Sequence, residues 1–240
     1  MDLVHPAYGS ERYAQFVRGM RGLVGFWRLD EGSGTNCLDQ SGQRNGTLTG
    51  TPGRLKGIHA RPGFGMGFTG TQYVTIADAD ALSIGTTGEM SWMCWTKPND
   101  NVQNHVIAKG VNLNYEWGLL RGVLPLFTNG TGYVFQIWQM TGNSYAAVQT
   151  GANRVPNNQW VHIVATVKTG TTLIIYLNGV EKARSTTFSG SIGNGTSAMN
   201  IGRRPDNVRP YNGDVADVAV WNRQLTAGEV MALYAEGLQK

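Results

Sequence analysis

The residue with the clearest chemical implication is Asp217, a carboxylate in the otherwise apolar run 215–221 near the C-terminus. The alternation of this run predicts a strand with Val215, Asp217 and Ala219 on one face. A buried carboxylate without a partner is costly, so something must compensate its charge. A metal ion is one candidate. Hydrogen bonds from backbone N–H groups or from an arginine are the alternative.

A second oxygen-rich segment, residues 39–47, combines a carboxylate, side-chain amides and a glycine-containing backbone in one tight turn. Calcium takes several oxygen ligands from flexible loops, including backbone carbonyls. We expect Asp39 and Asn45 as its ligands here, with Asp217 as a further carboxylate and Asp30 as an outside candidate. The alternative is an ordinary Asx turn, in which Asp39 and Asn45 bond to their own backbone.

The seven tryptophans offer flat apolar surfaces on which a sugar ring can stack. Most of them lie in alternating strands, where a tryptophan is more often a core residue. Trp117 and Trp138 are the candidates for carbohydrate binding, because their strands lie in the middle of the chain. Tyr115 and Gln136 would add polar contacts. Core packing is the alternative for this set.

Catalytic patterns are absent from the sequence. Asp78 and Asp80 are two residues apart, but the surrounding residues 77–82 read as a polar loop after a strand. The four histidines have no adjacent nucleophile or acid motif, and no zinc spacing, phosphate loop or nucleophile elbow occurs. The sequence therefore predicts a protein that is not an enzyme.

The composition favours one large domain of many strands. The chain has 240 residues, 33 of them glycine, and only 15% are charged. The net charge is +4, and the only tight basic cluster is Arg203–Arg204 with Arg209 nearby. We interpret this cluster as loop cations facing acidic neighbours and expect no direct contact with nucleic acid. Contact with nucleic acid or another acidic polymer is the alternative. Cys37 and Cys94 form no CxxC unit, so a disulfide between them stays open.

Helices are predicted only near the two ends. Residues 1–21 form an N-terminal arm, in which Ser10 caps a short amphipathic helix that either packs on the domain or docks on a partner. Thr226 and Glu229 form a capping box, which predicts a second helix from Thr226. Residues 1–6 lack the features of a signal peptide, and no segment has the roughly 18 apolar residues of a membrane helix. We therefore expect synthesis in the cytoplasm and no membrane contact.

Between these helices the sequence predicts one continuous β domain, residues 22–240. The expected strands are 22–29, 67–76, 90–97, 105–109, 117–121, 134–139, 146–150, 160–168, 173–177, 180–185, 199–202 and 214–221.

An ordered series of segments resembles the laminin-G-like, concanavalin-A-like jelly-roll domains. The segments are 25–34 (GFWRLDEGSG), 39–47 (DQSGQRNGT), 91–97 (SWMCWTK), 160–167 (WVHIVATV), 175–181 (IYLNGVE) and 212–234. The resemblance covers residues 22–237, and the order of the segments is more specific than any one of them. Residues 13–27 also resemble the lead-in of such domains in tailed-phage structural proteins.

The resemblance implies an all-β fold of two antiparallel sheets in a jelly-roll sandwich, with a short N-terminal helical arm and a short C-terminal helix. It implies that the first and last long strands are neighbours, so that loop 39–47 lies close to Asp217, where related domains often hold a structural calcium. It also implies that the strands of Trp117 and Trp138 line a concave face. Glycosidases of this broad fold carry a Glu-x-Asp-x-x-Glu strand. None of the seven glutamates here is followed two residues later by Asp.

The leading hypothesis is therefore a non-catalytic structural protein of a virion, made in the host cytoplasm. It would be a capsid decoration or tail-associated protein that docks on other virion proteins, the major capsid or the tail, through its N-terminal arm. Its lectin-like domain would bind host-surface glycans. The alternative is a free carbohydrate-binding or adhesion module, and a glycoside hydrolase is the third possibility.

Overall fold

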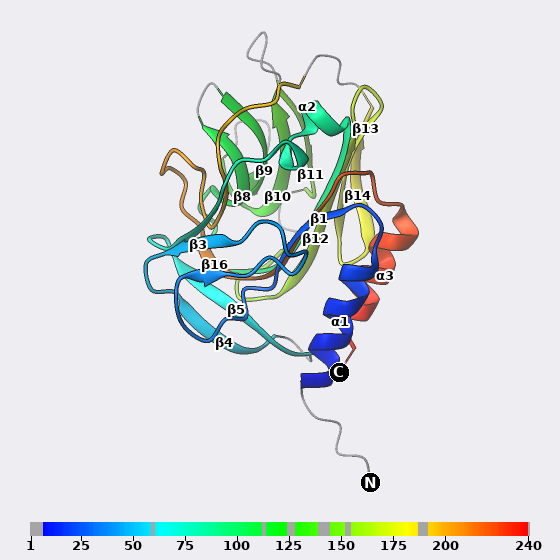
Figure 1. Cartoon of the computed structure of the whole chain (residues 1–240). Coiled ribbons are helices and arrows are strands. Elements are labelled where there is room, and N and C mark those ends of the chain that lie inside the picture. The colour runs from blue at the N-terminus through cyan, green and yellow to red at the C-terminus, as the bar shows by residue number, and fades with distance from the viewer. Residues whose placement is uncertain are drawn as a thin grey trace.

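The chain folds into two antiparallel sheets of eight strands each, stacked face to face as a sandwich (Figure 1). The structure, a computed structural model, describes residues 7–58, 61–111, 114–123, 128–138, 145–151, 155–186 and 192–239. The predicted all-β jelly-roll sandwich with a helix near each end is confirmed.

The first sheet has seven strands in one path, with β1 paired to β16 beside it. In path order they are β14 (Val180–Ser185), β13 (Thr172–Leu177), β12 (Val161–Lys168), β7 (Glu89–Pro98), β16 (Asn212–Trp221), β5 (Arg61–Thr69) and β4 (Gly53–Ile58), and β1 is Leu23–Trp27. The pairing of β1 with β16 makes the first and last long strands neighbours, as the resemblance implies.

The second sheet lies opposite the first and places the middle of the chain together. Its strands, in order, are β11 (Tyr145–Gln149), β10 (Thr128–Trp138), β9 (Asn114–Val123), β8 (Asn104–Val111), β15 (Met199–Ile201), β6 (Tyr73–Ile76), β3 (Gly46–Thr49) and β2 (Asn36–Cys37).

The core lies between the two sheets and is built around aromatic side chains. Trp92 on β7 contacts Trp117 on β9 and Phe135 on β10, with ring centroids 5.0 and 4.6 Å apart. Such tilted ring pairs add to the stabilisation that comes from burying large apolar surfaces. These rings therefore hold the first sheet to the second.

The two long helices, α1 (Ala7–Gly19) and α3 (Ala227–Gly237), lie side by side on the outer face of the first sheet (Figure 1). Tyr13, Ala14 and Val17 of α1 are buried in a cluster with Trp221 of β16 and Leu233 of α3. The packing alternative for the N-terminal helix is confirmed, so α1 belongs to the folded domain. The predicted docking arm requires a free apolar stripe on this helix. In the structure that stripe is covered by the domain and cannot dock on a partner.

Both helices can be compared with their predicted caps. The capping box of Thr226 and Glu229 is present and starts α3 as predicted. Ser10 does not cap α1, because the helix begins three residues earlier at Ala7. Within the described helices, none is long and apolar enough to cross a membrane.

The differences from the predicted strands lie in glycine-rich and polar segments. Residues 67–76 are two strands, β5 and β6, which the turn at Gly70 sends into different sheets. The predicted polar loop 77–82 ends in a 3-10 helix, η1 (Asp80–Leu82), and α2 (Ile84–Thr87) follows it. Leu82 and Ile84 are core residues. Their contribution was missed because two buried side chains in a polar run show no periodicity.

Two further predictions concern the two cysteines and the basic cluster around Arg204. Cys37 lies buried in β2, and burial raises the pKa of its thiol to about 12. Both Cys37 and Cys94 are free thiols. In the basic cluster, Arg204 pairs with Asp206 at 2.7 Å, as expected for a cation facing an acidic neighbour.

Candidate functional site

The Asp39 loop is held together by its own hydrogen bonds. Asp39 Oδ1 accepts from the backbone N–H groups of Phe26 and Ser41, both at 2.8 Å. Its Oδ2 accepts from Ser41 Oγ at 2.7 Å and from the N–H groups of Arg44 at 2.8 Å and Gln43 at 3.3 Å. Both oxygens of this buried carboxylate are occupied by donors, so the Asx-turn alternative describes the loop.

Of the other two predicted calcium ligands, Asn45 accepts a hydrogen bond within the loop, and Asp217 lies on a bulge of β16. Asn45 Oδ1 accepts a hydrogen bond from the Asp39 N–H at 3.0 Å. Asp217 is buried on a bulge of β16 with φ +50°, and its N–H donates to the carbonyl of Arg28. Burial raises the pKa of the nearby Asp30 carboxyl, Arg28 opposes this, and the charge of Asp217 adds to the rise.

Asp39 and Asn45 do not offer free oxygens to a calcium ion, because their side-chain oxygens already accept N–H or O–H groups. Across the ranges that the structure describes, no group of three or more His, Cys, Asp or Glu side chains is arranged to hold a metal. Calcium at Asp39, Asn45 and Asp217 stays a prediction that chelation can test.

We expect a chelator to leave the melting temperature unchanged, because N–H groups stabilise the Asp39 carboxylate without an ion. Thermal unfolding in EDTA, compared with unfolding in excess calcium, measures this directly. A lower melting temperature in EDTA that calcium restores would show that an ion is bound, since a ligand specific for the folded state raises its stability.

The predicted carbohydrate-binding residues divide between the core and the outer face of the second sheet. Trp117 is fully buried between the sheets, and its Nε1–H donates to the carbonyl of Leu82 at 3.0 Å. Its prediction as a binding residue is therefore wrong. Tyr115 pairs with Gly110 in the sheet register, and its side chain lies outside the described residues.

Gln136 and Trp138 point away from the core, because they alternate along β10 with Phe135 and Ile137, which point into it. Trp138 is half-buried and contacts Tyr145 on the neighbouring β11, with ring centroids 5.1 Å apart. Tyr145 is 42% exposed. We call Trp138 and Tyr145 the aromatic pair. It offers a ring surface at one end of the outer face.

A row of small and amide side chains crosses the same face beside the aromatic pair. The strand register places Gln136 beside Gly118, Gly118 beside Ala108, and Ala108 beside Asn200. We call these four residues the amide row. With strands about 4.8 Å apart, the two amides are about 14 Å apart along the row. Sequence reasoning missed Asn200, because only the register of β15 places it in this row.

The two amides of this row are buried and have unused acceptors. Gln136 and Asn200 are 2% and 3% exposed. Gln136 Oε1 and Asn200 Oδ1 accept no hydrogen bond from any residue that the structure describes. An unsatisfied buried acceptor costs about 1–3 kcal/mol. A ligand with hydroxyl donors that reached these oxygens would remove that cost.

Two carboxylates, those of Asp78 and Glu116, come together at one further place, where both form ion pairs with Lys109. Lys109 and Glu116 are fully buried, and Lys109 Nζ lies 2.5 Å from Glu116 Oε1, 2.7 Å from Asp78 Oδ1 and 2.8 Å from the carbonyl oxygen of Gly195. Burial raises the pKa of Glu116, and the hydrogen bond from Lys109 opposes the rise. One ammonium engages both carboxylates, so they do not form a free acid and base flanking a substrate.

Most of the chain matches the model of one known protein family. Residues 68–231, from β5 into α3, match the concanavalin A-like lectin/glucanases superfamily. The chain belongs to this superfamily. No curated protein matches the sequence.

Solved structures share the fold of this superfamily member at low sequence identity. Domain 4 of AbnA, a GH43 extracellular arabinanase from Geobacillus stearothermophilus, was solved in complex with arabinotriose. It is 18% identical with a TM-score of 0.65, over 88% of this chain and 98% of that one. The binding domain of botulinum neurotoxin DC, in complex with SialylT, is 16% identical with a TM-score of 0.68.

The toxin structures are larger than this chain. The match covers 91% of this chain and 52% of the botulinum neurotoxin DC binding domain. The binding domain of Paraclostridial Mosquitocidal Protein 1 is 12% identical with a TM-score of 0.67, over 89% of this chain and 52% of that one. The superfamily member therefore corresponds to about half of each toxin binding domain, and at these identities the likeness concerns the fold.

Proposed function

We propose that this superfamily member is a non-catalytic, lectin-like domain that binds glycans on the outer face of its second sheet. The observation that carries the proposal is the half-exposed aromatic pair, Trp138 and Tyr145, next to the amide row. Aromatic rings offer apolar faces for stacking, and amides supply directional hydrogen bonds to polar ligands.

Two further observations support this class of function. Domain 4 of AbnA was solved with arabinotriose and the botulinum neurotoxin DC binding domain with SialylT, so this fold carries binding domains elsewhere. The carboxylates of Glu116 and Asp78 are held by Lys109, which favours binding over hydrolysis.

Replacing Trp138 by alanine should weaken glycan binding at least tenfold, because it removes the larger ring of the aromatic pair. A tenfold loss corresponds to about 1.4 kcal/mol. A glycan array identifies the ligands of the unchanged protein, with arabinotriose as one probe, and calorimetry then compares the variants.

The matched control is Trp160→Ala, because Trp160 is also half-buried but lies beside Lys97 of the first sheet. This control should bind as the unchanged protein does, after circular dichroism has shown both variants to be folded. Equal binding by Trp138→Ala and the unchanged protein would contradict the proposed site. An array without any bound glycan would contradict the proposed function.

We propose further that the domain is displayed on a virion as a capsid decoration or tail-associated protein. The resemblance of residues 13–27 to the lead-in of phage structural domains supports this. Because the apolar stripe of α1 packs against the first sheet, attachment to capsid or tail proteins would use other surfaces. Mass spectrometry of purified particles tests the proposal, and particles without the protein would favour the free adhesion module.

A further inference from the structure

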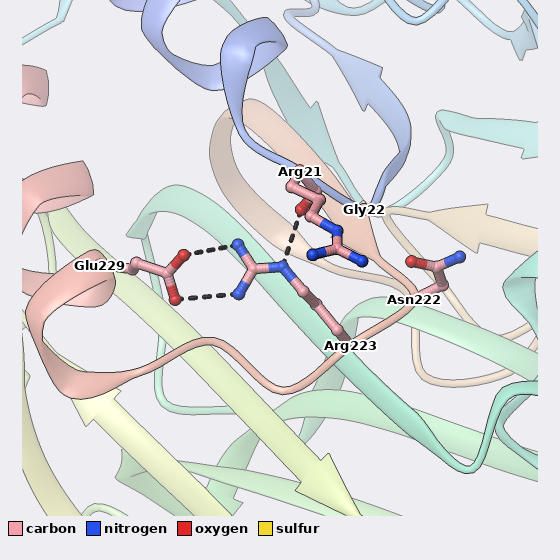
Figure 2. Close-up of a pocket in the computed structure, with 5 residues that line it drawn as sticks. All are labelled: Arg21, Gly22, Asn222, Arg223 and Glu229. Carbon is pink, nitrogen blue, oxygen red and sulfur yellow. Dashed lines mark hydrogen bonds and ion pairs between the residues drawn. The ribbon is translucent and has the colours of Figure 1, made fainter.

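A surface pocket of about 420 Å³ lies where distant parts of the chain meet (Figure 2). One wall is the turn between α1 and β1, and the other is the segment that joins β16 to α3. The lining residues are Arg21, Gly22, Asn222, Arg223 and Glu229. We call it the junction pocket.

One side of the junction pocket is rigidly built. Arg223 donates two hydrogen bonds to Glu229, at 2.5 and 2.9 Å, and a third from Nε to the carbonyl oxygen of Arg21 at 2.7 Å. Glu229 also accepts from the N–H of Thr226 in the capping box. The bonds from Arg223 hold the pKa of Glu229 at about 2. At neutral pH the charges of Arg223 and Glu229 therefore offset each other.

The other side of the pocket carries an uncompensated cation. Arg21 is exposed, and its guanidinium has no hydrogen-bond or ion-pair partner among the described residues. Figure 2 shows this guanidinium between Gly22 and Arg223, with the amide of Asn222 beside it. Since Arg223 and Glu229 cancel, Arg21 leaves one net positive charge in the pocket.

Glycine at position 22 keeps the space between these groups open. Its φ of +82° is a conformation that glycine adopts without strain. A Cβ atom there would lie 2.8 Å from Asn222 Oδ1 and 3.3 Å from the side chain of Arg223. The backbone N–H of Asn222 donates to the carbonyl of Gly22 at 2.9 Å, which fixes the two walls together.

We infer that the junction pocket binds an acidic sugar residue, whose carboxylate pairs with Arg21 and whose hydroxyl groups contact Asn222. The fork of an arginine matches a carboxylate with two parallel hydrogen bonds. The pocket volume lies within the roughly 300–1,000 Å³ of small-molecule sites. This site is separate from the aromatic pair and the amide row on the second sheet, which carry no charged side chain.

The inference is tested with methyl β-glucuronide and its neutral counterpart, methyl β-glucoside, titrated into the full chain and followed by NMR chemical shifts. The glucuronide should bind at least tenfold more tightly, and added salt should weaken it, because the contact is a partly exposed ion pair. Arg21→Gln should remove about tenfold of this affinity, and Asn222→Ala should weaken both sugars about threefold.

Lys182→Gln is the matched control, because it removes one exposed positive charge from β14, a strand that does not line the pocket. It should leave glucuronide binding unchanged. Equal binding of the two sugars, no binding of either, or equal losses in Arg21→Gln and Lys182→Gln would overturn the inference. A loss in Trp138→Ala without a loss in Arg21→Gln would move the acidic sugar to the second sheet. That result would contradict the junction pocket and leave the proposed function standing.

Discussion

Replacing Lys109 by alanine should destabilise the folded protein by about 3–5 kcal/mol, the usual cost of removing one partner of a buried ion pair. The ammonium of Lys109 contacts Glu116, Asp78 and the carbonyl of Gly195. Without it, the fully buried Glu116 carboxylate would lose its only compensating charge among these contacts. Urea unfolding at neutral pH, followed by tryptophan fluorescence, measures the change.

The pH dependence of this variant provides a second test. With Lys109 gone, burial would be opposed only by the hydrogen bonds from Gly195 and Ser83, so the pKa of Glu116 would rise further above the unfolded value. A raised folded-state pKa means that stability is present at low pH and is lost as pH rises through that pKa. The destabilisation of Lys109→Ala should therefore shrink as the pH is lowered.

Two matched variants separate the buried charge from the loss of a side chain. Lys182→Ala removes an exposed lysine and should change stability by no more than about 0.5 kcal/mol. Lys109→Met combined with Glu116→Gln removes both buried charges and should be more stable than Lys109→Ala. A loss below about 1 kcal/mol in Lys109→Ala would show that the buried carboxylate finds another partner.

Replacing Asp39 by alanine should cost about 3–5 kcal/mol, because several hydrogen bonds to one buried carboxylate are lost together. The backbone N–H groups of Phe26, Ser41 and Arg44 would lose their acceptor. The loop between β2 and β3 would then lose the contacts that fix it. Chemical denaturation compares this variant with the unchanged protein.

Asp80→Ala is the control for Asp39→Ala, because Asp80 is exposed and accepts one hydrogen bond from Asn194. It should change stability by no more than about 0.5 kcal/mol. The same loss in Asp39→Ala with and without EDTA would support hydrogen bonding as the role of Asp39. A loss that appears only when calcium is present would instead favour the metal.

Much of the fold follows from local patterns in the sequence. The alternation in β12 and β16 predicts strands that the structure contains, and the Thr226–Glu229 capping box predicts the start of α3. The family resemblance supplies the pairing of β1 with β16. Residues 36–37, 46–49 and 53–58 were not predicted as strands, because such short segments become strands only through pairing with their neighbours.

The candidate site was harder to predict, because it depends on register. Trp117 and Trp138 look alike in sequence, yet the registers of β9 and β10 turn one into the core and the other outward. The alternation of β16 did not predict that Asp217 occupies a bulge with positive φ, a conformation that aspartate tolerates. Lys109 and Glu116 carried a usable signal, since charged residues within apolar strands need partners.

The pairing of α1 with α3 has a mechanical consequence. Arg12 of α1 contacts Glu236 of α3 at 3.3 Å, and Arg223 ties the end of β16 to Arg21. The first described turn of α1 and the C end therefore emerge at the same edge of the molecule (Figure 1). A pulling force between residues 7 and 239 would peel the two helices from the first sheet before it loaded the sandwich core. The helix pair would separate first, before the tension reached the second sheet, which carries the proposed glycan site.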